Sequence, residues 1–114
     1  MANVPDVMMA AKNVAKVVLE NDTVRVLEFL IRAGEKAPMH NHPHDYVVYF
    51  MSNAKFRMTD PDGKSEDLDT MAGQAMWMWA GSHETINVGK TDGRYLIVEL
   101  KTTSEEAASL SDSS

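Results

Sequence analysis

Short apolar runs alternate with polar turn sequences along most of this chain. The segment from residue 14 to residue 31 is dense in β-branched and large apolar residues. It is interrupted only by Asn21-Asp22, a favourable turn dipeptide. We therefore predict two strands, Val14–Leu19 and Thr23–Ile31, joined by this turn.

The second of these predicted strands carries apolar residues on both faces. Because side chains alternate along a strand, Val24 and Val26 point to one side, and Leu27, Phe29 and Ile31 point to the other. The pattern indicates a bulge, an irregular strand folded over by the N-terminal segment, or a strand covered from both sides by a partner chain. The last alternative predicts a homodimer.

Turn sequences recur about every ten residues beyond this point, a spacing typical of an all-β sandwich or barrel. No segment after residue 13 has a sustained helical period. The predicted strands are Tyr46–Met51, Lys55–Thr59, Ser65–Leu68, Ala75–Trp79, Glu84–Val88 and Arg94–Thr102.

The two ends of the chain are less regular. Residues 1–13 are a poorly patterned lead-in, in which Asp6–Lys12 could form a short helix or an extended strand. Residues 104–114 are rich in serine and acidic side chains, and we predict a disordered tail there. A single domain is then expected over residues 1–103.

Composition narrows the class of protein. The chain has 114 residues, which suit one domain, and no cysteine, which excludes disulfides and thiolate metal sites. Its net charge of −6, without any basic cluster, argues against nucleic-acid binding. No apolar stretch approaches the roughly 20 residues that cross a bilayer, and the N-terminal residues lack the pattern of a secretory signal. We therefore predict a cytoplasmic protein that does not bind membranes.

Three histidines are the candidates for metal chemistry. His40 and His42 point to the same side of a strand, with Cα atoms roughly 6.5 Å apart, so their imidazoles can converge on one ion. His83 follows a glycine turn and begins a new strand. Across an antiparallel barrel it can face inward at the level of the other two. The alternative is that these side chains face solvent or line a polar cavity.

The segments around these histidines resemble the two motifs of the cupin family. Gly34, followed after five residues by His40 and His42, fits the first motif; Gly73, Gly81, His83 and Asn87 fit the second. Trp79 replaces the usual proline, and one residue rather than two separates Gly81 from His83. The resemblance extends over about residues 17–101. Among the cupins, the chain is most similar to small single-domain cytoplasmic members, a group that includes β-alanine degradation proteins.

This resemblance implies a double-stranded β-helix, or jelly-roll barrel, with a metal ion held by His40, His42 and His83. The family usually adds a Glu or Gln from the first motif, but Tyr46 and Val47 occupy the expected positions here. Tyr46 has inward parity and is a candidate proton donor. His44 also has inward parity, and Asp45 would turn inward only if Pro43 shifts the register. These two residues, with Met76 and Met78, are candidate pocket residues.

The preferred interpretation is a three-histidine centre for one divalent transition metal. Zn, Fe, Mn, Ni and Cu all accept neutral imidazole. We expect a small-molecule enzyme with dioxygenase-, isomerase- or decarboxylase-like chemistry, acting on a metabolite in small amino-acid or organic-acid catabolism. The alternative is a non-catalytic cupin that binds or senses a small ligand without metal.

Overall fold

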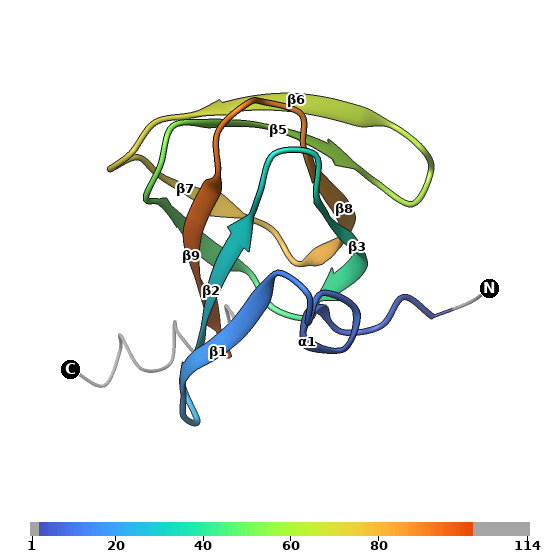
Figure 1. The fold of residues 1–114 in the computed structure, drawn as a ribbon. Coiled ribbons are helices and arrows are strands. Elements are labelled where there is room, and N and C mark those ends of the chain that lie inside the picture. The colour runs from blue at the N-terminus through green and yellow to red at the C-terminus, as the bar shows by residue number, and fades with distance from the viewer. Residues whose placement is uncertain (1–2, 102–114) are drawn as a thin grey trace.

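Nine strands form two antiparallel β-sheets (Figure 1). Alternating apolar side chains are buried between these sheets. The computed structural model describes residues 3–101, which form one short helix, α1 (Val7–Ala10), and nine strands. The strands are β1 (Ala15–Glu20), β2 (Val24–Ile31), β3 (Lys36–His42), β4 (Tyr46–Phe50), β5 (Ala54–Thr59), β6 (Ser65–Thr70), β7 (Ala75–Met78), β8 (Gly81–Asn87) and β9 (Gly93–Leu100).

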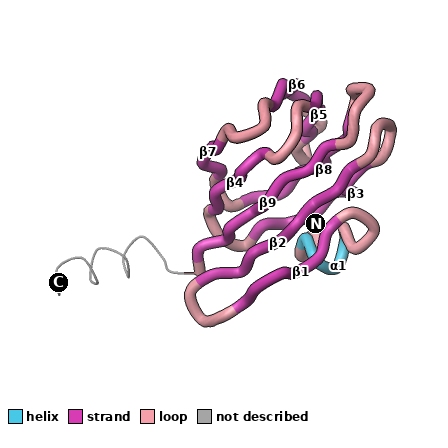
Figure 2. The backbone as a smooth tube through the Cα atoms, turned by 60° about the vertical axis from the view of Figure 1, so that its left-hand side comes forward, coloured by secondary structure: helices cyan, strands magenta, loops and turns pink. Residues whose placement is uncertain are grey.

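The strand order differs from the order along the chain. One sheet runs β1-β2-β9-β4-β7 and the other β3-β8-β5-β6, so the C-terminal strand β9 lies between β2 and β4 (Figure 2). Strands β3 and β8, far apart in sequence, are neighbours in the smaller sheet. This arrangement confirms the predicted all-β jelly-roll fold, and it brings the two histidine segments together.

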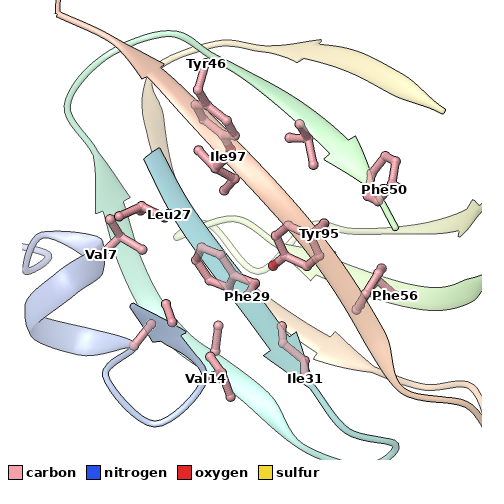
Figure 3. Close-up of a cluster of buried hydrophobic side chains, with 14 residues drawn as sticks. Val7, Val14, Leu27, Phe29, Ile31, Tyr46, Phe50, Phe56, Tyr95 and Ile97 are labelled. Atoms are coloured by element: carbon pink, nitrogen blue, oxygen red, sulfur yellow. The ribbon is translucent and has the colours of Figure 1, made fainter. Parts of the chain in front are cut away.

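The hydrophobic core fills the space between the sheets. Phe29 and Tyr95 stack with ring centroids 4.7 Å apart, and Phe56 meets Tyr95 edge-on at 5.5 Å (Figure 3). Leu27, Phe29 and Ile31 are fully buried, as their common strand parity predicts. The core cluster extends to Tyr46, beside which the buried side chain of His42 lies.

The lead-in forms the short helix rather than a strand. Asp6 caps it by accepting a hydrogen bond from the Met8 backbone N–H at 2.9 Å. The bulge lies in β1, between Val17 and Leu19, whereas β2 pairs with β9 without interruption. The irregularity expected in the second predicted strand is therefore in the first.

Most strand boundaries differ from the prediction by one or two residues, and the largest difference is at β8. β8 begins at Gly81, three residues earlier than expected, because Gly81 pairs with His42 and His83 pairs with His40. His83 therefore lies inside the strand. β9 ends at Leu100, and the tail predicted over residues 104–114 lies outside the described residues. Within residues 3–101, the helix is too short and insufficiently apolar to span a membrane.

Candidate metal centre

Three imidazoles from two strands converge inside the barrel. His40 and His42 lie on β3 and His83 on β8, where His83 is the cross-strand partner of His40. Among the residues that the structure describes, their ligand nitrogens lie within 4.8 Å of one another. His40 and His42 are each only 1% exposed, and His83 is partly exposed. The centre is therefore closed on one side and accessible at His83.

The partners of the Nδ1 atoms determine which nitrogens can bind a cation. His40 Nδ1–H donates to the carbonyl oxygen of Pro38 at 2.7 Å, and His42 Nδ1–H donates to Glu99 Oε2 at 3.1 Å. Because a carbonyl and a carboxylate accept hydrogen bonds, both protons are assigned to Nδ1. In neutral rings, both Nε2 atoms then carry lone pairs, and these two atoms are 3.1 Å apart.

Two lone pairs at this distance repel each other unless a cation lies between them. The cation can be a shared proton or a metal ion. Two imidazole nitrogens bound to one ion at about 2.1 Å lie roughly 3.0–3.4 Å apart when the angle at the ion is about 90–110°. The observed separation of 3.1 Å falls in this interval. The three histidines thus fit a divalent transition metal.

A buried carboxylate accepts a hydrogen bond from His42 Nδ1–H. Glu99, on β9, is fully buried and accepts hydrogen bonds from His42 Nδ1–H and Arg25 Nε–H. Arg25 in turn donates from its two terminal nitrogens to Asp6, at 3.1 and 3.0 Å. A carboxylate that accepts the second N–H of a metal-binding histidine fixes the tautomer and orientation of the ring. The chain therefore has a carboxylate at the centre, but as a partner of His42.

The charge states follow from burial and these contacts. Burial lowers the pKa of His40 to about 4; the carbonyl of Pro38 opposes this effect and repulsion from His42 adds to it. Burial also lowers the pKa of His83 to about 3, together with repulsion from His40 and His42. Burial raises the pKa of Glu99, but the hydrogen bonds from His42 and Arg25 outweigh it, so the net pKa is lowered. At neutral pH, His40 and His83 are uncharged, as metal ligands must be.

Tyr46 lies beside the histidines and faces the interior. Its ring stacks on His42 with centroids 4.2 Å apart, and it is 1% exposed. Burial raises the pKa of its hydroxyl, and the charge of Glu99 raises it further, so Tyr46 keeps its proton at neutral pH. It lines an inner cavity of about 30 Å³ together with His83. The proton donor suggested by the sequence is thus placed at the cavity.

The other candidate pocket residues divide into two pairs. Met76 and Met78 line the inner cavity, with His83. Among the described residues, His44 and Asp45 are outside the set that lines it. Asp45 instead accepts a hydrogen bond from the Ala80 backbone N–H at 2.8 Å, which ties the loop after β3 to the start of β8.

Asn87 of the second motif has a structural role. Its amide donates to the carbonyl oxygens of Ile31 and Thr91, both at 2.8 Å, and its Oδ1 accepts from the Gly89 N–H at 3.0 Å. These bonds hold the turn between β8 and β9. Asn87 therefore positions strands that carry the centre and does not bind the ion itself.

Glu99 and Arg25 were missed in the sequence, although their strand parity could have revealed them. Glu99 shares the parity of Tyr95 and Ile97, and Arg25 shares that of Leu27. A charged residue on the inward face of an apolar strand requires a buried partner. Two opposite charges with inward parity could therefore have been predicted to pair near the site.

Comparisons with known proteins agree with this description. A scan against models of protein families finds no match. The chain is 30% identical over 89 residues to the β-alanine degradation protein BauB of Pseudomonas aeruginosa, an alignment that covers 77% of this chain and 93% of BauB.

Solved structures extend the similarity to the whole fold. A cupin domain from Bordetella pertussis superposes with a TM-score of 0.72 and 25% identity, over 89% of this chain and 99% of that one. An RmlC-like cupin with a double-stranded β-helix fold from Methanocaldococcus jannaschii has a TM-score of 0.63 and 12% identity, over 76% and 78% of the two chains, and shows the fold alone. On this fold and this identity to BauB, the chain belongs to the cupin family, among the small proteins that include BauB.

Proposed function

We propose that this protein is a metal-dependent cupin enzyme that binds one divalent transition metal through His40, His42 and His83 and acts on a small metabolite. The observation that supports this most directly is the 3.1 Å separation of two Nε2 atoms whose rings have their Nδ1 protons engaged elsewhere. Zn, Fe, Mn, Ni and Cu all suit neutral imidazole, and elemental analysis will identify the ion.

A divalent ion held there would supply Lewis-acid chemistry to an oxygen of substrate or water. The chain's own residues prepare the site. The Pro38 carbonyl and Glu99 orient the imidazoles, and the apolar cavity walls exclude water. Tyr46, which keeps its proton at neutral pH and lines the cavity, is our candidate proton donor.

The name of BauB suggests the setting. BauB is a β-alanine degradation protein, and a role of the present chain in small-molecule catabolism is consistent with a site of this size. The cytoplasmic location of the present chain stays a prediction.

The second candidate is a metal-free cupin that binds or senses a small ligand. It is favoured by the fact that one proton shared between the two Nε2 atoms would also relieve their repulsion. The two candidates differ in metal content, which makes them directly separable.

Metal content of protein purified without a histidine tag tests the proposal. We expect close to one transition metal ion per chain by inductively coupled plasma mass spectrometry, and loss of that ion in His40→Ala and in His83→Ala. His44→Ala is the matched control, because His44 lies outside the group of three, and it should keep the metal. Circular dichroism will establish that each variant retains its β-structure. Wild-type protein without metal, and unable to take it up, would favour the metal-free candidate.

A further inference from the structure

The inner cavity beside His83 has walls that restrict the chemistry of its ligand. Within the part of the chain that the structure describes, its lining contains no Asp, Glu, Lys or Arg. Besides Tyr46 and His83, the lining has two uncharged hydroxyl side chains, Thr85 and Tyr95. The rest, called here the methionine wall, is thioether and hydrocarbon, contributed by Val48, Phe50, Phe56, Met58, Leu68, Met76, Met78 and Ile97. A ligand group placed there meets no fixed charge.

The charged side chains behind the histidines are already engaged. Arg25 donates from Nε to Glu99 and from both terminal nitrogens to Asp6. Glu99 accepts from Arg25 and His42. Neither the guanidinium nor the carboxylate is therefore free to pair with a charged ligand.

An outer groove of about 380 Å³ adjoins the inner cavity, since Met58, Leu68, Met76, Met78 and His83 line both. It also contains four charged residues, Asp60, Lys64, Glu66 and Asp67, and two of them have partners within the chain. Asp60 Oδ1 accepts from the backbone N–H groups of Asp62 and Lys64 at 2.9 Å each. Asp67 accepts from Arg57 at 2.8 and 3.2 Å. The carboxylates and the lysine of this groove are outside the lining of the inner cavity, so an ammonium group inside that cavity would have none of them among its lining residues.

We propose that the ligand of this site has one oxygen-bearing polar head, directed at the three histidines, and an uncharged apolar body of a few carbon atoms that lies along the methionine wall. This inference rests on the proposed function for the role of the histidines. It excludes β-alanine and other ligands that would have to place an ammonium group against that wall.

The physical reason is the asymmetry between the two ends of such a ligand. A polar head can be satisfied at the histidines. An ammonium group moved from water to the methionine wall loses its hydration without gaining a carboxylate partner. A methyl group in the same position gains free energy from leaving water.

Butyrate and β-alanine form a matched pair of probes, because both carry a carboxylate on a short chain and differ by a methyl in place of the ammonium. We expect butyrate to bind about tenfold or more tightly than β-alanine, since only the ammonium would lose its hydration in a lining that offers it no carboxylate. Dissociation constants are measured by ligand-observed NMR titration at pH 7, with the metal content of the same sample determined. Equal affinities, a preference for β-alanine, or no binding of either probe to metal-loaded protein would overturn this inference and leave the metal proposal intact.

A second pair covers the case in which the protein takes up no metal. Butan-1-ol and 3-aminopropan-1-ol differ in the same way and have a head that needs no metal. Butan-1-ol should bind more tightly to the metal-free protein; the reverse order would reject the inference independently of the metal.

A variant adds a gain-of-function test. Met58→Asp introduces a carboxylate on a wall shared by the cavity and the groove, so it should shift the affinity ratio toward β-alanine. Met71→Asp, at a position 67% exposed and outside the lining, is the control. An unchanged ratio in folded Met58→Asp would count against the proposed position of the ligand body. If that variant does not fold, the two probe pairs decide on the wild-type protein.

Discussion

Glu99 contacts His42 on the side away from the other two imidazoles. Glu99 on β9 is the cross-strand neighbour of Arg25 on β2 and of Tyr46 on β4. The guanidinium, the carboxylate and the phenol therefore lie in one row across the sheet. The carboxylate reaches Nδ1 of His42 rather than the centre of the three histidines. Glu99 is therefore a positioning residue.

Glu99→Gln tests this role with a side chain of nearly the same shape. We expect metal affinity to fall by about 10- to 100-fold, because the histidine loses its charged acceptor. Competition with a chromophoric chelator measures the affinity. The matched control is Glu84→Gln, which removes a carboxylate that pairs with Lys36 at 3.2 Å on the surface. Equal affinities in the two variants would contradict the role of Glu99.

The low pKa values of His40 and His83 predict how the stability of the metal-free protein depends on pH. In the unfolded chain a histidine has a pKa near 6.5, whereas in the folded chain the pKa values of these two residues are about 4 and 3. Below pH 6.5 the unfolded state therefore binds more protons, and the folded state loses stability as the pH falls. We expect a loss of about 5–6 kcal/mol between pH 7 and pH 4 from these two residues together, because a tenfold difference in proton affinity between the two states corresponds to about 1.4 kcal/mol.

Urea denaturation in the presence of a chelator, at a series of pH values, measures this dependence. His83→Gln removes one of the two histidines with a lowered pKa and should flatten the curve over the same interval. A wild-type stability that stays constant from pH 6.5 to pH 4 would show that the buried imidazoles are not held neutral.

At the scale of elements, the start of β9 depends on one close approach. Gly93 is buried and pairs with Ile31 of β2. A Cβ atom at position 93 would lie 2.3 Å from Cζ and 2.6 Å from Cε1 of the buried Phe56 ring. Glycine is therefore required here for packing between the two sheets, whereas at Gly34 and Gly73 it is favoured by positive φ angles of 83° and 91°.

Gly93→Ala should destabilise the protein by about 1–3 kcal/mol, the usual cost of inserting a methyl group into a packed core. Chemical denaturation measures the change. Phe56→Leu in the same background removes the clashing ring atoms, so the double variant should lose less than the sum of the two single losses. Additive losses would mean that the two residues do not clash.

Strand positions were largely predictable, because alternation and turn residues are local signals. The segments around β2, β4, β5 and β9 match the predictions within a few residues. The early start of β8 was not predictable in this way. Gly81 and Ser82 have weak strand preference, and it is pairing with His42 and Asn41 on β3 that extends the strand.

At the scale of the whole molecule, one apolar row crosses the outer face of the five-stranded sheet. Leu19, Val26, Val98, Val47 and Trp77 form one cross-strand row from β1 to β7. Leu19 is 52% exposed and Trp77 46% exposed. Contiguous apolar surface of this kind is characteristic of interaction sites.

We predict that the homodimer suggested by the sequence forms through this row. Light scattering coupled to size-exclusion chromatography should give twice the 12.7 kDa chain mass, and Leu19→Lys with Trp77→Lys should give the monomer. Met9→Lys, at a 68% exposed position on α1, is the control and should stay dimeric. A monomeric wild-type protein, or an unchanged mass in the double variant, would contradict this interface.

The sequence by itself determined the fold class and the three histidines. Strand alternation, turn spacing and the motif around His40 and His42 are short-range patterns, so they can be recognised without the tertiary structure. Only the tertiary structure decided what surrounds the histidines. Glu99 and Arg25 lie 57 and 17 residues from His42 along the chain, and β9 brings them to it by inserting between β2 and β4. Strand order in a sheet is set by packing over the whole chain, so the partners of a buried side chain cannot be determined from the residues next to it.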